Sequence, residues 1–330
     1  MHPRFLELLC CPATGETLSL AIEKQNDRGM VITGELRSAS GRSYPIIRGV
    51  PRFVSREQYA DSFGFEWTRW PRVQFESENR GRPMEGHTTR MWERITAAPD
   101  DQICGKTILD YGCGPGRFLD VVRRKGGIAV GIDLSNAVDA ARRNFADDPD
   151  VLIVQGDLFN PPFRPGAFDG GFSIGVLHHT PNPRQGMHAL SKLIRPGGWV
   201  SCCVYPKGDF YDFPSVRRFR ELHLSLRRHV GYRFALAYSY FAAFCLAPFL
   251  RRLKRWGLAK QVNHIERHWL VSLYVKDARW RVLDTFDAIT PAIASTHTTD
   301  EVSEWLTQSH CRDVRVTPWC ATSLSGRRAA

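Results

Sequence analysis

Three closely spaced glycines follow a short apolar segment at residues 108–116, which read Ile-Leu-Asp-Tyr-Gly-Cys-Gly-Pro-Gly. Gly112, Gly114 and Gly116 let the chain turn sharply and let its backbone approach a ligand where any Cβ would intrude. The helical pattern that follows at 116–125 points its N-terminal amides at the same place. The stretch therefore predicts a strand, a turn and a helix that together contact a bulky cofactor.

Two carboxylates follow the next apolar segments. Asp133 comes directly after residues 128–132, at the edge where open α/β sheets bind ligands, and from there it can accept hydrogen bonds from both ribose hydroxyls of a nucleoside. The alternative is a helix cap, because a helix begins near Ser135. Asp157 and Leu158 follow the third segment, where the carboxylate can accept from an exocyclic amino group and the leucine can cover an adenine face.

Candidate general bases lie after the fourth apolar segment, in the run Leu177-His178-His179-Thr180. A general base is needed only if the acceptor arrives protonated with a high pKa. The alternative for His179 is a structural role in the wall of a cofactor pocket. His87 and Tyr205 are further candidates.

The spacing of apolar residues between 106 and 205 alternates between strand and helix, which requires a parallel sheet covered on both faces. The expected strands are 107–111, 128–132, 151–155, 168–174 and 199–205, and the expected helices are 116–125, 135–147 and 183–194. The fold class expected is therefore α/β, an open three-layer sandwich.

The order of these motifs resembles the class I S-adenosylmethionine-dependent methyltransferases. The motifs are Asp-x-Gly-x-Gly-x-Gly, an aspartate ending the second strand, Gly-Asp-Leu, Leu-His-His-Thr and Leu-x-x-Pro-Gly-Gly. Nicotinamide-binding domains would show G-x-G-x-x-G instead. The resemblance implies a seven-stranded, mostly parallel sheet, completed by an antiparallel pair of strands at 313–318 and 321–325. A capping box at 298–301 predicts a helix from Thr298 to about Ser309 before these strands. The tail at 326–328 is expected to be frayed.

The resemblance also implies S-adenosylmethionine as cofactor, S-adenosylhomocysteine as product, and no metal. Its cofactor-binding positions include carboxylates, glycines and apolar side chains at the strand ends. They are Asp110 and Gly112 at the methionine end, Gly114 at the backbone, Asp133 at the ribose, Leu134 and Leu158 at the adenine faces, Asp157 at the amino group, and Ile174 at the ammonium. Arg90 is a further candidate, as partner of the cofactor's carboxylate.

Residues 1–54 resemble the small zinc-ribbon-type module that accompanies many methyltransferases. Cys11 stands at the first ligand position, but Thr14, Arg37 and Ser40 occupy positions where the other cysteines belong. One thiolate cannot provide a tetrahedral zinc site, so we expect a metal-free module held by a small apolar core.

Residues 55–101 form a connector rich in aromatic and charged residues, with a helix expected at 86–98. Its aromatic side chains, in the run 63–67 and at Trp70, pack either on the neighbouring domain or over the cofactor and substrate. The methyltransferase domain is expected at 102–330.

An insert of about residues 206–291 interrupts this domain, and in this fold such inserts commonly form a lid. Its apolar run at 234–250 lies between basic clusters at 217–233 and 251–260. The run is shorter than a membrane span and contains polar residues, so a buried lid helix is favoured over a transmembrane helix. The alternatives are a substrate pocket and a peripheral membrane contact through 227–255.

The amino-acid composition narrows the possible functions less than the motifs do. The 330 residues include nine cysteines without a paired spacing, which indicates free thiols in a reducing cytoplasm. The formal charge of +11 is compatible with a solvated surface, an acidic lipid surface or nucleic acid. The leading function is methylation of a small molecule at an oxygen, nitrogen or carbon nucleophile. The alternatives are an RNA methyltransferase, disfavoured by the apolar insert, and a non-catalytic activator subunit.

Overall fold

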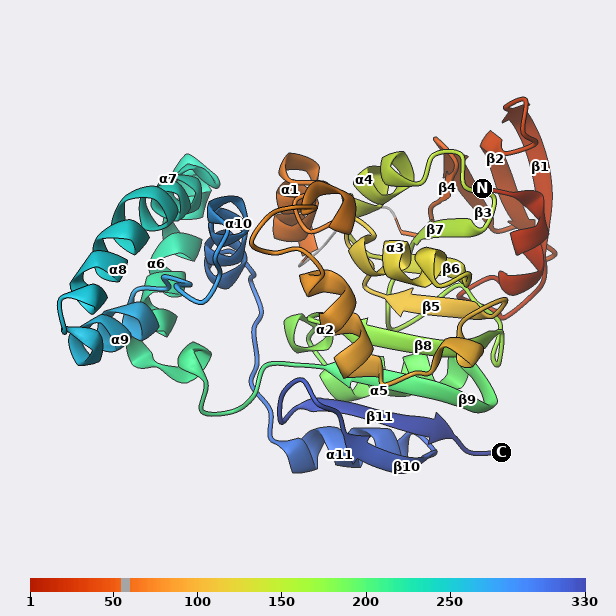
Figure 1. Cartoon of the computed structure of the whole chain (residues 1–330). Helices are drawn as coiled ribbons and strands as arrows, with labels where there is room; N and C mark the ends of the chain where they lie inside the picture. Colours follow the sequence, from red (N-terminus) through yellow and green to blue (C-terminus); the bar gives the residue numbers. More distant parts are fainter. Residues whose placement is uncertain (55–59) are drawn as a thin grey trace.

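A seven-stranded sheet forms the centre of the computed structural model, which describes residues 1–54 and 60–330 (Figure 1). Residues 55–59, the start of the expected connector, lie outside the described residues. The strand order is β10-β11-β9-β8-β5-β6-β7. The strands are β5 (Thr107–Tyr111), β6 (Ile128–Asp133), β7 (Val151–Gln155), β8 (Phe168–Ile174), β9 (Ile194–Cys203), β10 (Cys311–Val316) and β11 (Ser323–Arg328).

The five strands from β5 to β9 pair in parallel, and β11 pairs antiparallel with both β9 and β10. The predicted α/β fold with a seven-stranded, mostly parallel sheet is thus confirmed. The predicted frayed tail is wrong, because Gly326 and Arg327 pair with Val200 and Trp199 inside the sheet. The guanidinium of Arg327 also donates to the Gly197 carbonyl at 3.1 Å.

Helices cover both faces of the sheet. One buried apolar cluster joins one face to α2 (His87–Thr96), α3 (Arg117–Arg124) and α4 (Ala137–Asn144). The cluster on the other face includes α5 (Pro183–Leu193) and α11 (Thr299–Gln308). The expected capping box of Thr298 and Glu301 begins α11.

The N-terminal module is a four-stranded antiparallel sheet that follows the 3-10 helix Pro3–Leu8. Its strands are β1 (Leu18–Gln25), β2 (Val31–Ser38), β3 (Ser43–Ile47) and β4 (Val50–Pro51). Its apolar core is continuous with one face of the large sheet. Arg52 fixes the junction by donating to Gln155 and Asp139 at 2.6 Å each. The relation of this module to a zinc ribbon stays a prediction.

The insert folds into a helical lobe beside the sheet domain, at the left of Figure 1. It contains α6 (Pro214–Val230), α7 (Arg233–Phe241), a π-helical turn (Ala242–Leu246), α8 (Ala247–Arg255), α9 (Ala259–His268) and α10 (Ala278–Ile289). The segment from Arg233 to Arg255 is one continuous helix. The expectation that it is buried is wrong, because Phe241, Phe244 and Phe249 are 52%, 56% and 57% exposed.

Candidate active site

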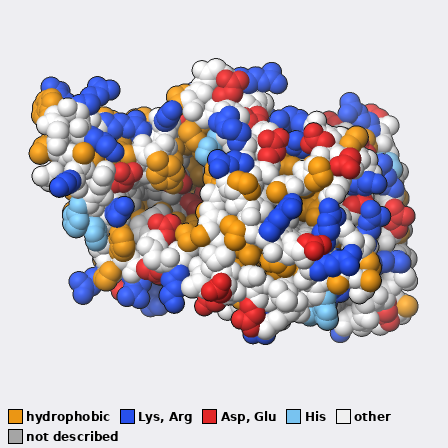
Figure 2. Space-filling model, turned by 60° about the horizontal axis from the view of Figure 1, so that its bottom comes forward, with side chains coloured by type: hydrophobic (Ala, Val, Ile, Leu, Met, Phe, Trp, Pro, Cys, Tyr) orange, Lys and Arg blue, Asp and Glu red, His pale blue; other side chains and the backbone are white. Residues whose placement is uncertain are grey.

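A cavity of about 520 Å³ lies at the carboxyl ends of β5, β6 and β8. The glycine turn forms one wall, and side chains from α10 and from helix α1 (Asp61–Arg69) of the connector form the opposite wall. Figure 2 shows the molecule hollowed between the helical lobe and the sheet domain. Parallel sheets bind ligands at this edge, because the strand-to-helix turns open there.

The glycine turn can accept no side chain. Gly112 has a φ of +96°, and a Cβ there would lie 2.4 Å from the side chain of Val176. A Cβ on Gly114 would lie 3.1 Å from the indole nitrogen of Trp67. The backbone of the turn therefore lines the cavity directly, as the sequence predicts.

Asp110 is the penultimate residue of β5, is 1% exposed and is not among the residues that line the cavity. One of its carboxylate oxygens, Oδ2, has no hydrogen-bond partner among the described residues. Burial, reinforced by the charge of Asp133, raises the pKa of Asp110 well above its usual range, although Arg117 opposes the shift. A buried carboxylate oxygen without a partner fits a ligand that brings a cationic donor, such as the ammonium group of S-adenosylmethionine.

Asp133 lines the cavity and also organises the turn. Its carboxylate accepts from the Gly114 amide at 2.9 Å, the Ser135 amide at 2.9 Å and the Ser135 hydroxyl at 2.7 Å. Asp133 does not cap α4, whose N-cap is Asn136 without a side-chain cap; its hydrogen bonds instead order the two turns that border the cavity. Burial raises the pKa of Asp133, and these three hydrogen bonds oppose the shift. They hold the carboxylate rigidly at the cavity.

Three of the predicted apolar positions, Leu134, Leu158 and Ile174, line the cavity. Tyr111 fixes the third strand-end loop by donating its hydroxyl hydrogen to the Leu158 carbonyl. Asp157 is not among the lining residues, since its carboxylate turns back and accepts from the Phe159 amide at 2.9 Å. The structure thus brings the leucine of the Gly-Asp-Leu motif to the cavity but not its aspartate.

Both predicted histidines lie in the cavity wall, where burial lowers their pKa values. His179 bonds through Nδ1 to the Ile293 carbonyl at 2.7 Å, so Nδ1 carries the proton and Nε2 is the free acceptor. Its pKa falls to about 3, chiefly through burial. His178 packs on Tyr205 with ring centroids 3.7 Å apart, and neither of its nitrogens has a partner among the described residues. Both rings are therefore neutral wall elements and weak bases.

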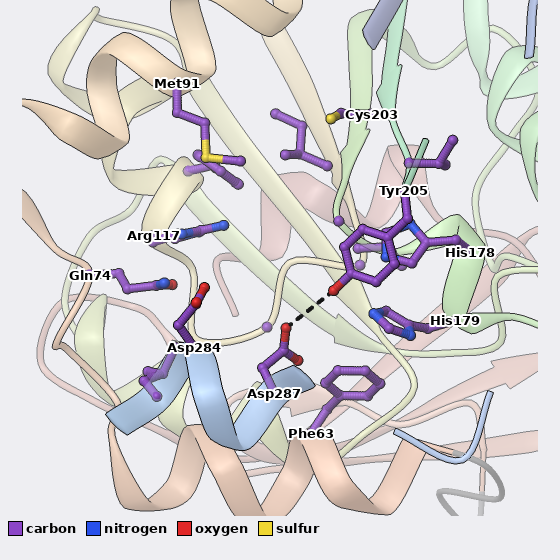
Figure 3. A pocket seen from close by; sticks show the side chains of 18 of the residues that line it. Phe63, Gln74, Met91, Arg117, His178, His179, Cys203, Tyr205, Asp284 and Asp287 are labelled. Carbon is purple, nitrogen blue, oxygen red and sulfur yellow. Dashed lines mark hydrogen bonds between the residues drawn. The ribbon is translucent and has the colours of Figure 1, made fainter. Parts of the chain in front are cut away.

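Two carboxylates from α10, Asp284 and Asp287, face the strand wall, and neither is among the site residues predicted from the sequence. Asp284 accepts from the Ser272 hydroxyl and from the Tyr274 hydroxyl at 3.0 Å. Asp287 lies 3.5 Å from the Tyr205 hydroxyl, and Figure 3 shows the two meeting in the cavity. Burial and the nearby charge of Asp284 raise the pKa of Asp287 to about 7. This carboxyl group can therefore exchange a proton near neutral pH.

The cation in the cavity is Arg117 rather than Arg90. Arg117, the first residue of α3, lines the cavity, and burial lowers its pKa to about 10 while Asp110 and Asp287 oppose the shift. The guanidinium of Arg90 is directed away, donating to the Glu85 carbonyl at 3.0 Å in an exposed position. The structure does not bring Arg90 to the cavity, because its guanidinium folds back over Gly86, and its predicted contact with the cofactor stays a prediction.

Some aromatic residues of the connector line the cavity, and others pack on the neighbouring part of the protein, so both expected arrangements occur. Phe63 lines the cavity with its ring 5.1 Å from that of His179, and Trp67 covers Gly114. Phe65 and Trp70 instead pack on Phe286 of the insert, at 5.8 and 5.2 Å. Helix α1 therefore both closes the cavity and connects it to the helical lobe.

Comparisons with known proteins agree with this geometry. Residues 109–202 match the family model described as "Methyltransferase domain". The chain is similar to a ubiquinone biosynthesis O-methyltransferase of Thiobacillus denitrificans, with 34% identity over 32% of this chain and 45% of the relative. A demethylmenaquinone methyltransferase of Clavibacter sepedonicus is 27% identical over 41% of this chain and 54% of the relative. The matches thus span about half the length of these curated relatives.

Human N-acetylserotonin methyltransferase, solved in complex with S-adenosylmethionine, superposes with a TM-score of 0.43 at 12% identity. It covers 78% of this chain and 58% of the human chain. The matched residues, which contain the glycine turn, identify the centre of this chain as a methyltransferase domain of the class I, S-adenosylmethionine-dependent type.

Proposed function

We propose that the protein methylates a hydroxyl or amino group of a small, largely apolar acceptor, and that Asp287 receives the proton that this group loses. The observation that carries the proposal is the position of Asp287. Its buried carboxyl group has a pKa of about 7 and lines the same cavity as the glycine turn. A base of this pKa is largely deprotonated at slightly alkaline pH and can still accept a proton readily.

The strand wall would hold the cofactor, which when bound supplies an electrophilic methyl group on sulfur. Asp110 would accept from its ammonium group and Asp133 from its ribose. Leu134 and Leu158 would cover the adenine, and the backbone of Gly112 and Gly114 would allow close approach. The chain's main contributions are then alignment of the reactants and exclusion of water, since a sulfonium is already a strong methyl donor.

The helical wall would bind the acceptor. Phe63 of α1, together with His179 and Tyr205 at the strand ends opposite, offers aromatic surfaces beside Asp287, as Figure 3 shows. Flat rings stack on such surfaces, and a polar group at the edge of the acceptor can then meet the carboxylate. The names of the relatives, which concern ubiquinone and demethylmenaquinone, support an acceptor of this apolar kind. Neutral His179, with its low pKa, would serve as a wall and not as the base.

The test incubates the purified chain with methyl-labelled S-adenosylmethionine and, in separate reactions, phenolic and quinol compounds, small-molecule extracts and total RNA. We expect label in a small molecule, and loss of most labelling in Asp287→Asn. Asp313→Asn is the matched control, because Asp313 is exposed and its φ of +54° suits asparagine.

Label appearing in RNA alone would contradict the small-molecule proposal. Cofactor binding without transfer to any fraction would favour the non-catalytic alternative. Full labelling by Asp287→Asn would remove Asp287 as the proton acceptor while leaving methyl transfer itself in place.

A further inference from the structure

An apolar stripe runs along the outer face of the helix from Arg233 to Arg255. Its exposed members recur at helical spacing and are Ala237, Tyr240, Phe241, Phe244, Cys245, Pro248 and Phe249. The rings of Tyr240 and Phe244 stack with centroids 6.2 Å apart. Figure 1 places α7 and α8 at the outer edge of the lobe, on the side away from the sheet. Exposed aromatic side chains gathered on one helix face mark an interaction surface more often than a solvated one.

The inner face of the same helix is fixed to the lobe. Buried Arg281 of α10 donates to the Ala243 carbonyl at 2.9 Å, within the π-helical turn. Arg251 donates to the carbonyls of Leu273 and Val275 at 2.9 and 3.0 Å. The helix is long and apolar enough to cross a membrane, with a mean hydropathy of 1.4 and one third of that window buried. The contacts of Arg281 and Arg251 instead attach the inner face of this helix to the lobe, so that its outer face is the one exposed to solvent.

Charge around the stripe has a single sign. The chain contains no Asp or Glu between Leu222 and Ile265, and in that interval it carries eight Lys and Arg residues. They are Arg227, Arg228, Arg233, Arg251, Arg252, Lys254, Arg255 and Lys260. Arg252 lies over the ring of Trp256, 4.8 Å from its centroid, and that indole is itself 63% exposed. An aromatic stripe ending in a cationic rim with an exposed tryptophan suits the boundary between lipid headgroups and acyl chains.

We propose that this face docks on an anionic lipid bilayer, with the helix in the plane of the surface. The phenylalanines would enter the headgroup boundary, and the Lys and Arg residues would contact lipid phosphates. A second copy of this chain fits the face poorly, because two such faces would oppose positive charges. Of the eight Lys and Arg residues, Arg227 pairs with Asp61 and Arg251 bonds to lobe carbonyls, and the others include exposed Arg252, Lys254 and Arg255. The surface stands independently of the proposed methyl transfer.

The docking helix is also connected to the cavity. Arg281, which holds the π-helical turn, is in α10 three residues before Asp284, and α10 carries both Asp284 and Asp287 of the helical wall. A protein docked in this way would present its acceptor wall close to a membrane surface, where an apolar acceptor would be concentrated.

The test is co-sedimentation of the full chain with two kinds of vesicle, phosphatidylcholine alone and phosphatidylcholine mixed with phosphatidylglycerol. We expect sedimentation with the anionic vesicles only, weakened by salt. Phe241→Ser/Phe244→Ser and Arg252→Glu/Arg255→Glu should each lower the partition coefficient ~10-fold or more, through lost apolar insertion and lost attraction respectively.

Matched controls come from the opposite parts of the molecule. Ile22→Ser/Ile47→Ser removes exposed apolar side chains from the N-terminal sheet, and Arg312→Glu/Arg315→Glu reverses exposed charges on β10. Both control variants should bind vesicles like the unmodified chain. The proposal is overturned if the unmodified chain stays in the supernatant, if all four variants bind equally, or if the phenylalanine variant instead dissociates a dimer in size-exclusion chromatography.

Discussion

The two walls of the cavity are constructed differently. The strand wall uses backbone turns and the carboxylate of Asp133, which is held by three hydrogen bonds from its own neighbourhood. The helical wall uses side chains of α1 and α10. Among the described residues, Asp287 has one long hydrogen bond, from Tyr205 at 3.5 Å, whereas Asp284 accepts from Ser272 and Tyr274. A wall fixed by its own hydrogen bonds suits a constant ligand. A wall of weakly partnered side chains can change its ligand with a few substitutions.

The electrostatics of the walls differ in the same way. Hydrogen bonds from Ser135 and Gly114 oppose the upward pKa shift of Asp133, whereas Asp284 adds to the upward shift of Asp287. At the strand wall these hydrogen bonds favour the ionised form of Asp133, although burial still raises its pKa and raises that of Asp110 well above its usual range. The helical wall is arranged to let a carboxyl group gain and lose a proton.

Removing the carboxylate of the helical wall should have the largest effect. Asp287→Asn keeps the shape of the side chain but cannot accept a proton, so kcat should fall ~10²–10⁴-fold. The dissociation constant of S-adenosylmethionine should stay within about twofold, because the cofactor is assigned to the other wall. Steady-state kinetics and calorimetry separate the two quantities. A large loss of cofactor affinity would show that the two walls do not divide the ligands in this way.

A substitution in the strand wall should instead affect binding of the cofactor. Asp133→Ala removes hydrogen bonds to a charged acceptor worth ~1.5–3 kcal/mol, so cofactor affinity should fall ~10–100-fold. The acceptor KM, measured at saturating cofactor, should change little. Ser135→Ala tests the positioning of the carboxylate separately, since it removes one hydrogen bond to the carboxylate and keeps the carboxylate itself. Unchanged cofactor binding in Asp133→Ala would remove the ribose assignment.

The strand wall was also the more predictable of the two. Its residues follow apolar strands at fixed spacing, so local sequence predicted β5, β7 and β8 with their observed ends. Asp287 is more than one hundred residues from the glycine turn, and only the packing of the insert brings it there. The pair Asp284 and Asp287 carries a weak local signal, one helical turn apart beside Tyr274. Exposure of the helix at Arg233–Arg255 likewise depends on which face α10 covers, which composition does not encode.

The pH dependence should distinguish the walls by a smaller effect. A base with a pKa of about 7 makes kcat fall roughly tenfold per pH unit below that value and level off above it. Asp284→Asn removes a nearby negative charge, which should lower the pKa of Asp287 and move the inflection to lower pH. The pH profile of kcat checks the direction. A shift to higher pH, or a profile without an inflection near neutrality, would exclude Asp287 as the titrating group.

The smallest expected effect concerns Arg90, which lies outside the cavity, compared with Arg117, which lines it. Arg90 is exposed with its guanidinium on the Glu85 carbonyl, so Arg90→Ala should leave cofactor affinity within about twofold, as is usual for a surface substitution. Among the described residues, Arg117 is the one Arg or Lys that lines the cavity. Because it can pair with the carboxylate of the cofactor, Arg117→Met should weaken cofactor binding. Calorimetry on both variants measures the difference. If Arg90→Ala weakens binding and Arg117→Met does not, the connector must rearrange when the cofactor binds, and the strand wall would then be less preformed than its hydrogen bonds indicate.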